Sequence, residues 1–141
     1  MSLVLAMFLM FQSAPAPSGA FGNWVTADKS VVDMYQCGEH ICGKLVKFSA
    51  PVTVTTDNRN PKPELRQRPL CGLMIAEGFR MTDATHITEG HVYDPESGKT
   101  YSGVITVEGN ALKLRGYVGI PLFGRTEVWH RAKEPVAECG K

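Results

Sequence analysis

The fold is decided by the stretch Thr100-Tyr101-Ser102-Gly103-Val104-Ile105-Thr106-Val107-Glu108-Gly109-Asn110-Ala111-Leu112-Lys113-Leu114-Arg115. Apolar and polar residues alternate on both sides of a turn at residues 108–110, where Gly109 and Asn110 tolerate a positive φ. A period of two is typical of a strand that has one face in a core and one in water. The stretch therefore predicts a β-hairpin.

The same pattern recurs along the chain from residue 21 onward. Period-two runs separated by turn residues predict eight strands, near residues 23–26, 30–37, 41–48, 72–80, 85–93, 100–107, 111–118 and 124–131. Outside an insert at residues 49–71, each strand with its turn takes about 12 residues, as in an antiparallel meander. An open sheet would expose two edges, so we predict an all-β, eight-stranded antiparallel up-and-down barrel, with an open sandwich as the competing fold.

The composition excludes several classes of protein. The 141 residues carry 15 Lys+Arg against 14 Asp+Glu, and this near-neutral balance argues against a nucleic-acid partner. A hydrophobic fraction of 43% is too high for a disordered chain, and the length predicts a single domain.

The N-terminal region resembles an export signal. Residues 3–11 are apolar without interruption, which is too short to span a bilayer but suits a signal-peptide core, although no Lys or Arg precedes the run. Two small-x-small sites compete, one ending at Ala16 before Pro17 and one ending at Ala20. We expect cleavage after Ala20, which gives a signal peptide at residues 1–20, a barrel at residues 21–134 and a tail at residues 135–141. An uncleaved anchor or a buried N-terminal helix is the alternative; cleavage would leave no stable membrane insertion and a periplasmic or secreted protein.

Four cysteines follow the predicted signal, as suits an oxidising compartment. Cys37 and Cys42 bracket a four-residue hairpin loop and are expected to pair, whereas a second pair, Cys71 with Cys139, is left open by the sequence. Loop entropy gives about 2 kcal/mol for the short loop and about 4 kcal/mol for the long one. No Cys-x-x-Cys accompanies them, so we expect neither a metal nor a cofactor.

Two aromatic residues and an arginine are assigned structural roles. In a closed barrel Trp24 on the first strand neighbours Arg131 on the last, and a cation–π stack between them would plug one end. Trp129 is assigned a structural role as well.

The segment Asp94-Pro95-Glu96-Ser97-Gly98 predicts a hairpin turn that ends at Gly98 with positive φ. It lacks the number of ligands that a calcium loop needs.

Several polar residues are candidates for an anion-binding site. The insert carries a local charge of +2 over residues 57–68, and Arg66 and Arg68 could meet a carboxylate or phosphate. Tyr93, Tyr101, Arg115 and Arg125 would add to such a site if they face the barrel interior; the alternative is that all of these residues face water. The odd spacing of His86 and His91 places them on opposite strand faces and argues against a shared metal. No nucleophile motif occurs, so we expect no enzyme.

Four segments in combination resemble the bacterial domain of unknown function family 2147, a family of small exported proteins: residues 35–45, 60–73, 93–101 and 114–131. The resemblance covers about Gly22 to Arg131 and implies a small lipocalin-like barrel in the cell envelope, with no assigned activity to carry over. Many members of that family have Cys where this chain has Tyr117, which leaves the partner of Cys71 open.

Two functions follow from these observations. The first is binding of a small amphipathic or apolar molecule inside the barrel, with no catalysis. The second is an envelope scaffold or protein–protein interaction module with a filled barrel, whose protein partner the sequence does not identify. A continuous cavity of at least roughly 300 Å³ would favour the first.

Overall fold

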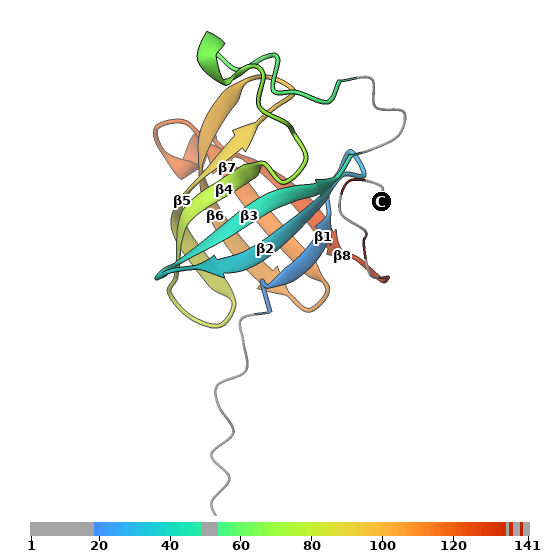
Figure 1. Cartoon of the computed structure of the whole chain (residues 1–141). Coiled ribbons are helices and arrows are strands. Elements are labelled where there is room, and N and C mark those ends of the chain that lie inside the picture. The colour runs from blue at the N-terminus through green and yellow to red at the C-terminus, as the bar shows by residue number, and fades with distance from the viewer. Residues whose placement is uncertain (1–18, 49–53, 135, 137–138, 140–141) are drawn as a thin grey trace, which may run out of the picture.

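The computed structural model describes residues 19–48, 54–134, 136 and 139, and it shows a closed barrel (Figure 1). Most of the predicted signal peptide, part of the insert and most of the tail lie outside these residues. The strands are β1 (Gly22–Val25), β2 (Val31–Cys37), β3 (His40–Lys47), β4 (Met74–Met81), β5 (His86–Asp94), β6 (Lys99–Glu108), β7 (Ala111–Tyr117) and β8 (Arg125–Arg131). Two short 3-10 turns, η1 (Pro63–Leu65) and η2 (Pro121–Phe123), lie between strands.

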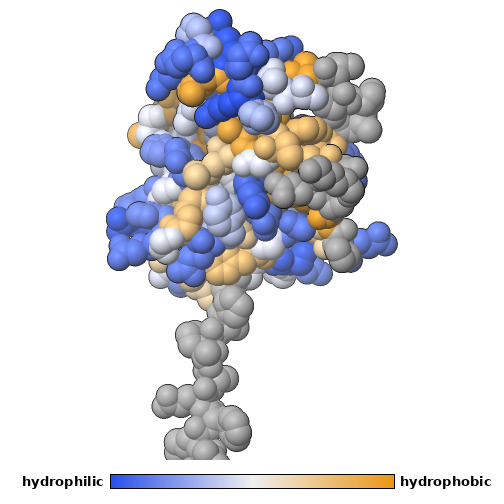
Figure 2. All heavy atoms as spheres, in the orientation of Figure 1, coloured by the Kyte–Doolittle hydropathy of each residue, from blue (hydrophilic) through white to orange (hydrophobic). Residues whose placement is uncertain are grey.

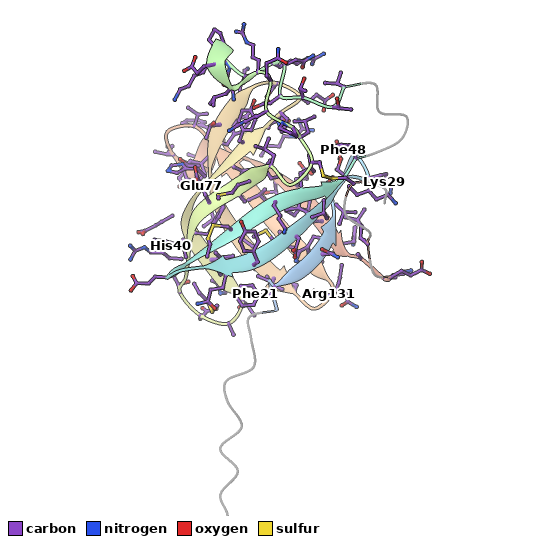
Figure 3. All side chains as sticks on the ribbon, viewed as in Figure 1. Phe21, Lys29, His40, Phe48, Glu77 and Arg131 are labelled. Atoms are coloured by element: carbon purple, nitrogen blue, oxygen red, sulfur yellow. A yellow bond between two sulfur atoms is a disulfide. The ribbon has the colours of Figure 1, made fainter. Side chains whose placement is uncertain are left out.

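Every strand pairs antiparallel with its neighbour in sequence, and β8 returns to β1. The predicted up-and-down barrel is therefore confirmed. The returning seam is short, because only Trp24 with Arg131 and Val25 with His130 are in register there. Phe21 and Arg131 lie at one end of the barrel, while Phe48 and Lys29 lie toward the other end (Figure 3).

Side chains fill the barrel axis. The largest fully buried side chains on the strands are all apolar: Trp24, Phe79, Met34, Ile87, Ile105, Leu112 and Val32. Glycines on neighbouring strands make room for the central ring: a Cβ at Gly90 would collide with Phe79, and one at Gly103 would lie 3.1 Å from that ring. The described part of the interior is thus packed in the manner of an ordinary protein core.

Two local predictions were wrong. The β2–β3 turn contains two residues rather than four, because Cys37 pairs with His40 and the ladder continues to the turn. Cys42 is in register with Tyr35, so the Cys37–Cys42 disulfide runs diagonally across the hairpin with 5.9 Å between the Cα atoms. Both disulfides are present: Cys71 also pairs with Cys139 and ties the insert to the C-terminal segment.

The second error concerns the histidines of β5. The β5–β6 register shifts between Ile87 and Gly90, and Glu89 in this bulge has a φ of 64°. Ile87 and Gly90 both face the core, so the bulge changes the alternation and leaves His86 and His91 both exposed, not on opposite faces. Their partners on β6, Thr106 and Ser102, are four residues apart, so the histidines remain too distant to share a metal.

Candidate functional site

The insert between β3 and β4 attaches to the barrel through a buried carboxylate. Asp57 is 1% exposed, and its carboxylate accepts three side-chain hydrogen bonds: Tyr93 Oη donates to Oδ1 at 2.5 Å, while Asn60 Nδ2 and Arg68 Nε each donate to Oδ2 at 2.9 Å. The Arg68 guanidinium also lies over the Tyr93 ring, 5.6 Å from its centroid. One side chain of β5 and three of the insert therefore form a single cluster.

The electrostatics of this cluster favour a charged Asp57 and a neutral Tyr93. Burial alone would raise the pKa of Asp57, but the hydrogen bonds from Tyr93, Asn60 and Arg68 and the Arg68 charge outweigh burial and hold the pKa below its ordinary value. Burial, followed by the hydrogen bond to Asp57 and its negative charge, raises the pKa of Tyr93 to about 12. At neutral pH the cluster is an ion pair with a phenol donor.

Backbone contacts fix the shape of the insert around Asp57. The Asp57 N–H donates to Arg68 O at 3.0 Å, and Thr56 and Pro69 form a β-bridge, so the two arms of the insert run side by side. The Asn60 amide oxygen accepts the Lys62 N–H at 2.9 Å. Asparagine and aspartate satisfy such turns with their own side chains, which explains their place in a proline-rich segment.

A second attachment joins the insert to the β5–β6 turn. Arg59 Nη1 donates to Glu96 O at 2.7 Å, and the Arg59 carbonyl approaches Gly98 so closely that a Cβ there would collide with it. Gly98 has a φ of 73°, as a left-handed turn position requires. The Gly98 N–H donates to Asp94 O at 2.8 Å, so the hairpin turn predicted at residues 94–98 is present.

A cleft of about 410 Å³ opens beside this cluster, between the insert and strands β4, β5 and β6. Its lining has an apolar part and a polar part. The apolar residues are Pro61, Leu65, Leu73, Met74 and Ile75, and the polar ones are Asn60, Lys62, Arg68, Glu77, His91, Tyr93 and Thr100. The outer surface of the insert above the cleft is mainly hydrophilic (Figure 2).

The structure brings together only some of the residues selected as anion-binding candidates. Arg68 and Tyr93 meet at Asp57, and Arg66 Nε donates to the Asn60 carbonyl at 2.7 Å, so the insert itself supplies the acceptors for both arginines. The Asp57 carboxylate thus occupies the place in which an external anion was expected to meet Arg68.

The other candidates lie apart from the cluster. Tyr101 is half-buried and in register with Val92, on the same face of β6 as the core-facing Gly103. Arg115 is on the outer face of β7 and donates to Pro121 O at 2.8 Å. Arg125 is exposed at the start of β8, in register with Gly116. No common site unites them with Arg68.

The residues assigned to the plug at Trp24 and Arg131 lie toward the opposite end of the barrel. The Arg131 guanidinium stacks on Trp24 at 4.2 Å from the ring centroid, and Trp24 Nε1 donates to Ala20 O at 2.8 Å. Trp129 is buried, and its Nε1 donates to Glu127 Oε1 at 2.8 Å.

Sequence reasoning missed Asp57 and Asn60. The insert has no hydrophobic periodicity that would show which of its polar residues turn inward. The available signal was chemical: a lone Asp within a segment that also holds Arg66 and Arg68 supplies a carboxylate that an arginine in the same segment can reach.

Within residues 19–48, 54–134, 136 and 139, no helix is long and apolar enough to cross a membrane. The same part of the chain holds no group of three or more His, Cys, Asp or Glu side chains placed to hold a metal ion.

The closed eight-stranded barrel with a short β1–β8 seam is a lipocalin-like fold. Residues 22–131 match the family described as "Uncharacterized protein conserved in bacteria (DUF2147)", and the chain belongs to this family. Protein HP1028 of Helicobacter pylori, described as belonging to the lipocalin family, is similar in structure with a TM-score of 0.74 and 21% sequence identity, over 80% of this chain and 82% of that chain. At this identity the likeness concerns the fold alone. No curated protein matches the sequence significantly.

Proposed function

We propose that the protein binds a small amphipathic molecule in the cleft under the insert, as a non-catalytic binding protein of the bacterial envelope. The observation that carries the proposal is the cleft of about 410 Å³, which lies within the size range of ligand sites. The packed barrel axis argues against the deep interior as the binding place and in favour of the rim.

The lining favours a ligand with an apolar body and an anionic group. Leu65, Leu73 and Met74 offer the apolar surface, and Lys62 and Arg68 lie beside it. Arg68 already neutralises Asp57, so Lys62 supplies the cation without an assigned partner in the described part of the chain. Envelope location is supported by the two disulfides, which persist in oxidising compartments.

Strand β4 offers a matched pair of variants for the test. Met74 and Met81 are the same residue type on one strand, and each is 44% exposed, but Met74 lines the cleft and Met81 is at the other end of β4. The probe is 8-anilinonaphthalene-1-sulfonate, an anionic amphipathic dye. We expect Met74→Glu to weaken dye binding about tenfold, since it adds a like charge and removes apolar contact, and Met81→Glu to leave it unchanged.

Organic extraction of protein purified from its own envelope, followed by mass spectrometry, would identify the natural ligand. Equal dye binding by both Met variants, or a chain that binds no dye and yields no extract, would refute the proposal.

The filled barrel also favours the alternative of a scaffold that acts through surface contacts. In that case crosslinking in the envelope should recover one specific protein partner, and Met74→Glu should not change its yield.

A further inference from the structure

The loop between β7 and β8 carries the most exposed apolar side chains of the described residues. Four such side chains occur within six residues: Val118, Ile120, Leu122 and Phe123 are 73%, 51%, 75% and 78% exposed. A single exposed apolar side chain needs no explanation, but a contiguous group of this kind marks an interaction surface.

The backbone of this loop is held in place. Arg115 Nε donates to Pro121 O at 2.8 Å and Nη2 to Leu122 O at 3.4 Å, while Nη1 donates to Thr126 Oγ1 at 2.9 Å. Around η2, the N–H groups of Phe123 and Gly124 donate to Ile120 O and Pro121 O at 3.2 and 3.0 Å. The apolar side chains are therefore held outward and do not fold back onto the barrel.

These hydrogen bonds also reduce the cost of moving the loop out of water. An unpaired backbone polar group is expensive in an apolar medium, and here Arg115 and η2 satisfy the carbonyls and N–H groups next to Leu122 and Phe123. Pro121 has no N–H to satisfy. Around η2 the loop therefore combines exposed apolar side chains with paired carbonyls at residues 120–122, which lowers the cost of entering a lipid interface.

We infer that this loop docks the protein shallowly on an anionic lipid surface. Arg115 and Arg125 flank the apolar residues on β7 and β8, and such cations are attracted to anionic headgroups. The same charges argue against a second copy of the chain as the occupant, because two apposed loops would bring four arginines together. The contact is interfacial, since six residues are too few to span a bilayer.

Docking would place one end of the barrel at the membrane. In an up-and-down barrel the β7–β8 loop lies at the same end as the β3–β4 insert (Figure 1). The insert would therefore lie near the lipid surface. The inference does not depend on the cleft being a ligand site.

The test is flotation of the chain from Gly19 onward with vesicles of phosphatidylglycerol and phosphatidylethanolamine, and with phosphatidylcholine vesicles for comparison. This chain contains all eight strands and both disulfides and lacks the apolar run at residues 3–11. We expect binding to the anionic vesicles, reduced about tenfold or more by Leu122→Asp and by Phe123→Asp. Met81→Asp, at the other end of the barrel, should bind like the unchanged chain.

A reporter variant gives a second readout. Trp24 and Trp129 are both buried, so Phe123→Trp adds one exposed indole whose emission should shift to the blue on the anionic vesicles. Absence of flotation, equal flotation of the Asp variants, or equal binding to phosphatidylcholine would overturn the inference. So would light scattering that shows a loop-dependent dimer, or crosslinking that shows a loop-dependent protein partner, without vesicle binding.

Discussion

The Arg131 guanidinium lies over the Trp24 indole, and the same two residues face each other in register across the β1–β8 seam. Arg131 Nη1 also donates to Phe21 O at 2.8 Å, and Nη2 donates to Gly19 O. One arginine thus joins the last strand to the first strand and to the segment before it, at a seam that has only two registered pairs.

Arg131→Ala should lower the free energy of unfolding by about 2–3 kcal/mol, because it removes a partly buried cation–π contact and charged hydrogen bonds to carbonyls. Arg131→Lys should be intermediate, since lysine keeps the charge but not the planar fork. Urea unfolding at neutral pH measures both. Arg125→Ala is the control and should change stability by less than about 0.5 kcal/mol; a similar loss in both alanine variants would contradict the assigned role of Arg131.

Asp57→Asn should destabilise the protein by about 2 kcal/mol at neutral pH, because it removes the charge that Arg68 and Tyr93 face. The pKa of Asp57 is lower in the folded than in the unfolded protein, so its contribution is fully present above the ordinary value of 3.8 and is lost as the pH falls through the folded value. The difference between the two proteins in urea unfolding should therefore shrink below about pH 4. This difference is the relevant quantity, because the pKa of Asp83 is also lowered, to about 2, by the Thr85 N–H first of all.

Tyr93 provides an independent control on the same cluster. With the pKa of Tyr93 raised to about 12, an ultraviolet titration should contain a late tyrosine ionisation step near pH 12. Tyr93→Phe should remove that late step, and Asp57→Asn should move it to lower pH. A late step that survives Tyr93→Phe would show that Tyr93 is not its source.

Periodicity was sufficient for the strands and insufficient for the site. The alternation of Leu112 and Leu114 with Lys113 and Arg115 predicts a half-buried strand, because only one register turns both leucines toward the core. Repetition of this pattern over eight segments predicts a closed barrel. The bulge at Glu89 could not be predicted, since no sequence pattern indicates that one extra residue changes the inward–outward alternation of β5.

The interior of the site depends on contacts between distant segments. Asp57 accepts a hydrogen bond from Tyr93, which lies 36 residues later in the chain. The local sequence of the insert contains no pattern that predicts this contact. Trp24 and Arg131 were easier to connect, because closure of the barrel makes the first and last strands neighbours whatever their separation in sequence.

Gly90→Ala should destabilise the barrel by about 2–3 kcal/mol, because its Cβ would collide with the buried Phe79 ring. Gly103→Ala should cost less, since its Cβ would meet the ring at 3.1 Å. Thermal unfolding measures both. Phe79→Leu should partly rescue Gly90→Ala; a neutral Gly90→Ala would mean that the interior is loosely packed and open to a ligand.

Removal of the Cys71–Cys139 disulfide should cost more than removal of the Cys37–Cys42 disulfide. The sequence separations are 68 and 5 residues, so loop entropy gives about 4 and about 2 kcal/mol respectively. Double serine variants of each pair, unfolded in urea, make the comparison. A larger loss from the short loop would show that contacts, not chain entropy, dominate at the hairpin.

The segment before β1 bears on the expected cleavage site. Ala20 is fully buried and its carbonyl accepts the Trp24 Nε1–H, while the Gly19 carbonyl accepts from Arg131. Cleavage after Ala20 would remove both carbonyls and leave the buried indole N–H to find another partner, at a cost of about 1–3 kcal/mol.

We therefore predict that the mature N terminus lies at or before Gly19. Ala16-Pro17-Ser18 also satisfies the small-x-small rule, and a cut after Ser18 would keep Gly19 and Ala20 in the barrel. Intact mass and N-terminal sequencing of the exported protein determine the site directly. An N terminus at Phe21 would contradict the prediction; in that case a chain that begins at Gly19 should be more stable in urea than the exported form, because it regains both carbonyls.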